Sequence, residues 1–199
     1  MQERIWPRLG AASGVLYVVL VFGFTSSGSD SQVILLPEMI GMLFFIPFLG
    51  YLYDVLRRAE GGWLSATAFG AGLVEFTVRL VSIFPVFVAR QEGMPPQLEQ
   101  VLEDMGNFAY IVTMLPIGVM MAAVALVIFK TRVLPFWLGL LAALTALACW
   151  INGMFLEAAF GPAFLLFLLW VAIASVVLTL QGTASRSVEP SSPEPVRVR

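Results

Sequence analysis

Six long apolar runs divide the chain, and charged residues or clusters of Gly, Pro and Ser separate them. A bilayer core about 30 Å thick needs about 20 apolar residues in a helix that rises about 1.5 Å per residue. Each run comes close to that length, so we predict an all-α fold, a polytopic bundle of six transmembrane helices. The predicted helices span residues 9–25, 39–56, 63–88, 107–129, 134–151 and 163–180.

The composition supports a membrane protein. Of the 199 residues, 59% are hydrophobic and 12% are charged, and the mean hydropathy is +0.91, whereas soluble domains carry about 25% charged residues. We predict one transmembrane domain over residues 1–181. Residues 182–199 are rich in Ser, Pro and charged residues, a composition that predicts a disordered tail.

The basic residues lie beside alternate ends of the runs. Nine of the eleven fall on one predicted side: Arg4, Arg8, Arg57, Arg58, Lys130, Arg132, Arg186, Arg197 and Arg199. The segments on the other side carry acidic residues and, apart from Arg90, no basic residue. Under the positive-inside rule, both termini and the tail are predicted to be cytoplasmic.

The first run could also be interpreted as a cleaved signal peptide, because a basic start precedes it and small residues follow it. The run is longer than the roughly 7–15 apolar residues of such peptides, and its cleavage pattern is poor. A retained first helix is therefore favoured, and the sequence leaves cleavage open.

The segment "PPQLEQVLEDMGNF", residues 95–108, places Leu98, Val101, Leu102 and Met105 at helical spacing behind two prolines. We expect a short helix that lies on the outer membrane surface and leads into the run 107–129. A solvated cap is the simplest interpretation, and a cation or partner site is the alternative.

Proline and glycine mark further local features. Pro47, Pro85 and Pro116 each lie inside a predicted helix, where the lost backbone hydrogen bond predicts a bend. Gly10 and Gly14 have the GxxxG spacing, which indicates a close-packing face. A contact between two copies of the chain, and so a homo-oligomer, is the alternative use of that face.

Glu75 and Arg79 lie in the stretch "LVEFTVRLVSIF", residues 73–84, near the middle of the third predicted helix. A charge at the bilayer centre costs about 2.5–3.5 kcal/mol on insertion scales, so this pair needs an explanation. Four residues apart, the two side chains share one helix face and can form an ion pair. The same face carries only small or polar residues: Ser65, Ala68, Gly72, Glu75, Arg79 and Ser82. Such a stripe predicts that this face is turned toward the bundle interior.

Two interpretations of Glu75 and Arg79 follow. In a transporter or channel subunit, Glu75 would be a proton or cation site in a polar cavity, with Arg79 as its counter-charge or as an anion anchor. In a structural bundle, the two would form a buried ion pair that fixes the helix register. The structural interpretation is favoured, because no second titratable group can be placed beside the pair.

Four other residues are candidates for the walls of an interior polar site that would include Ser82. Tyr51 and Asp54 share a face of the second helix, although Asp54 can also reach Arg58 as an interfacial ion pair. Asn107 and Tyr110 lie toward the outer end of the fourth helix, where hydrogen bonds between helices are the simplest expectation.

The sequence offers little catalytic chemistry. It has no histidine and one cysteine, Cys149, so the common zinc, haem and dyad sites lack their usual groups. It also lacks the phosphate-loop, HExxH, GxSxG and CxxC motifs and any basic, aromatic nucleic-acid patch. We predict no catalytic residue, metal, cofactor or nucleic-acid partner, and expect membrane lipids as partners. A lipid-modifying enzyme has least support, since only Asp54 with Tyr51 starts the acidic cluster it would need.

Residues 129–155, "FKTRVLPFWLGLLAALTALACWINGMF", combine a short basic loop, Leu-Pro, Leu-Gly and an apolar helix. This element resembles one found in several bacterial membrane proteins, and with the helix count it is similar to the six-helix domain of unknown function 4386 family. The resemblance implies a bacterial cytoplasmic membrane protein and supplies no activity or site. We therefore predict a non-enzymatic structural or regulatory membrane protein, with a small transporter or channel subunit as the alternative.

Overall fold

A computed structural model describes residues 6–25, 35–91, 93–155 and 162–184. Helices account for nearly all of them, and no strand occurs among the described residues. The helices are α1 (Trp6–Thr25), α2 (Leu35–Arg58), α3 (Trp63–Ala89), α4 (Pro96–Val112), α5 (Met114–Thr131), α6 (Phe136–Phe155) and α7 (Pro162–Ala184). The predicted all-α bundle is confirmed.

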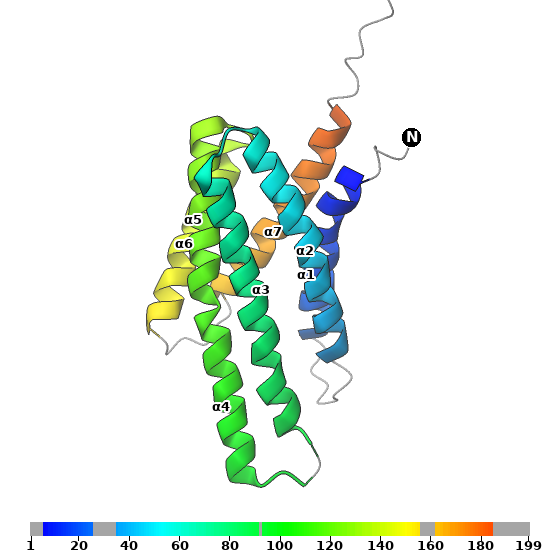
Figure 1. Cartoon of the computed structure of the whole chain (residues 1–199), viewed down its shortest axis with the longest axis vertical. Helices are drawn as coiled ribbons and strands as arrows, with labels where there is room; N and C mark the ends of the chain where they lie inside the picture. The colour runs from blue at the N-terminus through cyan, green and yellow to red at the C-terminus, as the bar shows by residue number, and fades with distance from the viewer. Residues whose placement is uncertain (1–5, 26–34, 92, 156–161, 185–199) are drawn as a thin grey trace, which may run out of the picture.

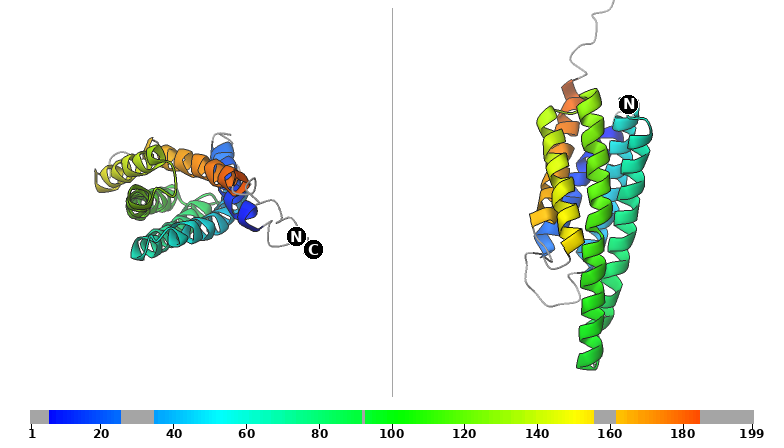
Figure 2. Two further views of the ribbon diagram at one scale, coloured as in Figure 1. Left: turned by 90° about the horizontal axis from the view of Figure 1, so that it is seen from above. Right: turned by 90° about the vertical axis from the view of Figure 1, so that its left-hand side faces the viewer.

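The helices form a closed ring. In chain order, α1 packs on α2, α2 on α3, α3 on α5, α5 on α6 and α6 on α7, and α7 returns to α1 (Figures 1 and 2). The start of α1 and the end of α7 lie at the same end of this ring as the α2–α3 and α5–α6 connections (Figure 1). The described chain therefore crosses the bundle an even number of times.

Among the described residues, five helical spans are long and apolar enough to cross a membrane: Met39–Arg58, Trp63–Ala89, Pro96–Thr131, Phe136–Phe155 and Pro162–Leu180. The segment Leu9–Gly23 of α1 is apolar but shorter. This is the pattern of a multi-pass membrane protein, and four spans agree closely with the predicted bounds. Helix α7 runs to Ala184, and the rest of the predicted tail lies outside the described residues.

Helix α4 differs from the expectation for residues 95–108. The segment is helical as predicted, but it does not lie flat on the surface; it packs along α3 and continues into α5. The α3–α4 hairpin extends beyond the other helices (Figure 1). Gly106 explains the close contact, because a Cβ there would lie 3.2 Å from the Ser82 carbonyl oxygen of α3. The predicted surface orientation was wrong because hydrophobic spacing identifies an apolar face without identifying what covers it.

The junction between α4 and α5 lies at Thr113, three residues before Pro116. Proline has no N–H, so the carbonyl of Val112 loses its helical donor. The Thr113 hydroxyl donates to the Tyr110 carbonyl at 2.6 Å, which satisfies an acceptor in the last turn of α4. The helix is therefore interrupted one turn before Pro116, whereas α2 and α3 continue through Pro47 and Pro85.

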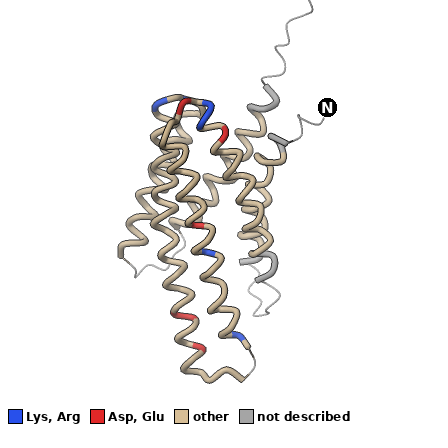
Figure 3. The backbone as a smooth tube through the Cα atoms, in the orientation of Figure 1, with Lys and Arg blue, Asp and Glu red and all other residues tan. Residues whose placement is uncertain are grey.

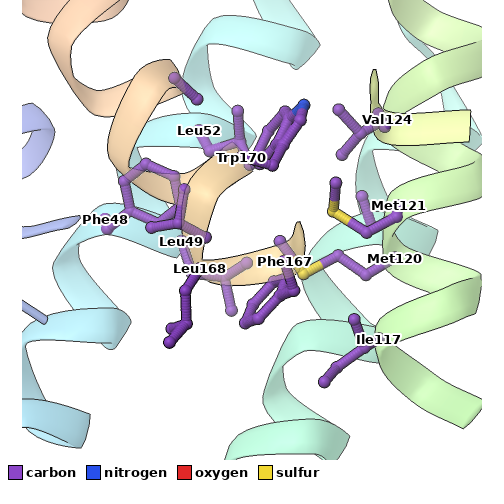
Figure 4. Packing of buried hydrophobic residues seen from close by; sticks show 14 of the residues in the cluster. Phe48, Leu49, Leu52, Ile117, Met120, Met121, Val124, Phe167, Leu168 and Trp170 are labelled. Atoms are coloured by element: carbon purple, nitrogen blue, oxygen red, sulfur yellow. The ribbon is translucent and has the colours of Figure 1, made fainter. Parts of the chain in front are cut away.

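Large side chains fill the centre of the ring (Figure 4). Phe167, Leu168 and Trp170 of α7 meet residues of α2 and α5 there, all of them buried. These are Phe48, Leu49, Leu52, Ile117, Met120, Met121 and Val124. The Trp170 indole N–H donates to the Leu138 carbonyl of α6 at 3.0 Å, so the polar atom of this large residue is satisfied.

The GxxxG face of α1 is used inside the bundle. A Cβ at Gly10 would lie 2.8 Å from the Cβ of Tyr51 in α2. At Gly14 it would overlap Ser175 of α7 and come 2.7 Å from a ring carbon of Phe48. These glycines therefore let α1 approach both of its neighbours closely.

Candidate functional site

The small and polar stripe of α3 faces the bundle interior, as the sequence predicts. The buried residues of α3 are Ser65, Ala68, Gly72, Glu75, Arg79, Ser82, Ile83 and Ala89, which include the whole predicted stripe. Glu75 is 1% exposed and Arg79 is 3% exposed. On the opposite face, Leu73, Leu80 and Phe84 are exposed, as expected for side chains that contact lipid.

Gly72 brings α3 close to two neighbours one turn before Glu75. A Cβ at this position would lie 2.7 Å from Leu49 Cδ1 of α2 and 3.2 Å from Met120 Sδ of α5. Apolar side chains from the centre of the ring, Leu49 and Met120, therefore lie one turn away from the charged pair.

Arg79 is held between two aromatic rings from different helices. Its guanidinium carbon lies 4.5 Å from the ring centroid of Tyr110 in α4 and 4.4 Å from that of Phe164 in α7. The two rings also meet edge to face, with centroids 5.8 Å apart. A guanidinium over a ring face is attracted by the ring quadrupole, and the attraction grows when water is excluded. This cluster of Arg79, Tyr110 and Phe164, the arginine clamp, joins α3, α4 and α7.

The predicted ion pair within α3 is incomplete. Oε1 of Glu75 is buried and accepts no hydrogen bond within the described part of the chain, so Arg79 does not donate to this oxygen. Stacking on Tyr110 and Phe164 directs the guanidinium toward the neighbouring helices instead. Glu75 supplies a buried carboxyl group beside the arginine clamp, and the two opposite charges remain close enough to interact.

The remaining predicted residues divide into two groups. Ser82 and Tyr110 lie with the charged pair: Tyr110 is part of the arginine clamp, and the Ser82 hydroxyl donates to the Arg79 carbonyl at 2.7 Å. Asn107 is exposed, and Tyr51 is half-buried against Gly10 of α1. Neither is shown in contact with Glu75.

Asp54 pairs with Arg58 near the end of α2. The two form a double contact, Arg58 Nε to Asp54 Oδ1 at 3.0 Å and Nη2 to Oδ2 at 2.8 Å, with both side chains partly exposed. The simpler expectation, an interfacial ion pair, is confirmed. Of the residues predicted for the interior site, four therefore lie together: Glu75, Arg79, Ser82 and Tyr110.

Phe164 was missed by sequence reasoning. It lies in the apolar run "AFLLFLLW" at the start of α7, where every aromatic residue has the same appearance in the sequence. The spacing of Phe164, Phe167 and Trp170 at three-residue intervals indicates one helix face, but it does not say that a cation from α3 meets it.

Metal-ion chemistry finds no support among the residues that the structure describes, where no three His, Cys, Asp or Glu side chains are grouped to hold an ion. No protein-family model, curated protein or solved structure matches the chain. The resemblance of residues 129–155 to the domain of unknown function 4386 family therefore stays a prediction.

Proposed function

We propose that the chain is a non-enzymatic, structural or regulatory multi-pass protein of the bacterial cytoplasmic membrane. In this proposal, the charged residues of α3 fix the arrangement of the bundle rather than bind a substrate. The observation that carries it is the near-complete burial of Arg79, at 3% exposure, between rings supplied by α4 and α7.

The arginine clamp restrains the positions of three helices at once. A buried guanidinium is stable only where its charge is compensated, so α3, α4 and α7 must keep the arrangement that supplies Tyr110, Phe164 and Glu75. Polar groups of this kind select one packing among the alternatives that an apolar interface would allow. The proposed role of the pair is therefore to specify the position of the α3–α4 hairpin against α7.

The charge distribution supports cytoplasmic termini. Arg57, Arg58, Lys130 and Arg132 lie near the connections α2–α3 and α5–α6, where Figure 3 shows a group of basic residues, whereas Arg79 and Arg90 lie within α3 and at its end. Glu99, Glu103 and Asp104 lie on the α3–α4 hairpin at the other end. The positive-inside rule then assigns the first end to the cytoplasm. The tight packing of α1 on α2 and α7 supports a retained first helix.

A transporter or channel subunit is the second candidate, and one observation favours it. Glu75 Oε1 is a buried carboxyl oxygen with no hydrogen-bond partner among the described residues, which is unusual in a purely structural core. A proton or a small cation moving through the bundle would supply the missing partner. This candidate requires a water-accessible route to Glu75, whereas the structural proposal requires a dry centre.

Thiol accessibility separates the two candidates. Ser65 and Ser82 lie on the buried stripe on either side of Glu75 and Arg79, and each can be changed to cysteine in a Cys149→Ser chain. In the membrane-embedded protein, we expect neither cysteine to react with a small, water-soluble thiosulfonate reagent. Gln100→Cys, at an exposed position of α4, is the reactive control. Rapid labelling at residue 65 or 82 in the folded protein would replace the structural proposal with the transport candidate and identify the side from which water enters.

A further inference from the structure

The two connections at the basic end of the bundle share one pattern, with basic residues before the connection and a tryptophan after it. The α2–α3 connection follows Arg57 and Arg58 and precedes Trp63, and the α5–α6 connection follows Lys130 and precedes Trp137. The two tryptophans are 74% and 50% exposed at the starts of their helices. Each connection also holds a non-glycine residue in the left-handed region, Glu60 with φ 60° and Arg132 with φ 57°.

The two connections lie side by side. A Cβ at Gly61 would be 3.1 Å from Cγ1 of Val127 in the last turns of α5, and α3 packs on α5. Around these two connections, Arg57, Arg58, Lys130 and Arg132 outnumber the acids Asp54 and Glu60. The basic residues of the two connections therefore lie at the same end of the bundle, on neighbouring helices.

Arg132 is an exposed side chain whose position is fixed by contacts within the α5–α6 connection. Its backbone N–H caps α5 by donating to Ile128 at 2.9 Å, and its guanidinium carbon lies 4.4 Å from the centroid of the Phe136 ring. Phe136 in turn packs on Phe129, with centroids 5.2 Å apart. The side chain is exposed. The ring contacts one face of the guanidinium and leaves the N–H donors around its edge uncovered by that ring, and this planar edge matches the oxygens of a phosphate.

Arg58 has a different role from the other three cations. Its double contact with Asp54 occupies one edge of the guanidinium and neutralises the acid. Arg57, Lys130 and Arg132 are then the exposed cations that can attract an external anion. The first turn of α3 begins at Trp63, directly after the α2–α3 connection, and Gly62 supplies no side-chain cap for its N–H groups.

We propose that this surface binds the phosphate of an anionic phospholipid headgroup between the two connections, with Arg132 as the main contact and Lys130 and Arg57 as supporting charges. The exposed Trp63 and Trp137 favour a lipid over a free anion, because indole rings at the starts of membrane spans lie at headgroup depth. The proposal goes beyond the structural role, since it holds whether or not the centre of the bundle opens.

Lipid retention by the full chain tests the proposal. The protein is held in micelles containing equal amounts of phosphatidylglycerol and phosphatidylcholine, and native mass spectrometry measures the ratio of the two bound lipids. We expect the wild type to retain several-fold more phosphatidylglycerol. Each removed cation should lower the ratio by up to about fivefold, which is the effect of about 1 kcal/mol per basic residue near an anionic surface. Lys130→Gln with Arg132→Gln should therefore remove most of the preference.

Arg90→Gln is the matched control, because it removes an exposed arginine at the opposite end and should leave the ratio unchanged. Arg132→Lys keeps the charge, loses the planar donor edge and should give an intermediate ratio; it also replaces the double variant if that chain fails to fold. Excess inorganic phosphate should not displace the lipid. Equal retention of both lipids by the wild type, an unchanged ratio in the folded double variant, an equal loss with Arg90→Gln, or full displacement by phosphate would each overturn the proposal.

Discussion

The guanidinium carbon of Arg79 lies 4.4 Å from the ring centroid of Phe164, which joins a charge in the middle of α3 to the first turn of α7. Eighty-five positions separate these residues in the sequence, so the contact is a long-range restraint on the ring. Tyr110 completes the arginine clamp from α4. Within the described chain, Arg79 is the one buried charged side chain that stacks on aromatic rings from two other helices.

Phe164→Leu should destabilise the folded protein by about 2 kcal/mol. The substitution keeps an apolar side chain but removes the ring face, and a desolvated cation–π contact is worth about 2 kcal/mol. Thermal or denaturant-induced unfolding in detergent, followed by circular dichroism, measures the change. Phe84→Leu is the matched control, because Phe84 is 68% exposed on the lipid-facing side of α3 and should lose little. An equal loss in both variants would show that ring size, and not the contact with Arg79, accounts for the effect.

Arg79→Met should cost about 3 kcal/mol or more, because it leaves the Glu75 carboxylate buried without its counter-charge. Adding Glu75→Gln to the same chain should recover part of the loss, since the second change removes the uncompensated charge. The free energy of unfolding is measured for the wild type, both single variants and the double variant. These four values form a double-mutant cycle, which isolates the interaction energy between the two residues. A double variant as unstable as the sum of the singles would mean that the charges do not interact.

The inward face of α3 could be predicted because its signal is local. Small and polar residues recur at helical spacing from Ser65 to Ser82, and only burial makes that pattern favourable in a membrane. The partners of that face could not be predicted in the same way. Phe164 is one aromatic residue in an apolar run, and the direction of α4 depends on its close contact at Gly106 with α3. Such contacts depend on which helices become neighbours, and periodicity within one helix carries no information about that.

Gly118→Ala should destabilise the bundle by about 1–3 kcal/mol through overpacking. A Cβ at Gly118 of α5 would overlap the indole of Trp150 in α6 and lie 3.0 Å from its Cε2 atom. The half-buried indole of Trp150 would have to shift for the added methyl group to fit. Unfolding in detergent measures the loss.

Gly70→Ala provides the opposite control for Gly118→Ala. Gly70 lies inside α3 and is exposed, and no atom of the described residues lies within 4 Å of an added Cβ. Alanine favours a helix over glycine by up to about 1 kcal/mol, so this variant should be unchanged or slightly more stable. If Gly70→Ala destabilised the protein as much as Gly118→Ala, the loss would come from replacing a helical glycine by alanine and not from the contact with Trp150.

The α3–α4 hairpin should project from the outer face of the membrane. The span Pro96–Thr131 contains 36 residues, which corresponds to about 54 Å of helix, whereas a bilayer with its headgroups measures about 40–45 Å. In a Cys149→Ser chain expressed in intact bacterial cells, Gln100→Cys should therefore react with a membrane-impermeant maleimide. Glu60→Cys, in the α2–α3 connection, should react only after the cells are permeabilised. The reverse pattern would invert the proposed topology, and protection of both positions would mean that α4 is covered by lipid or protein instead of projecting into water.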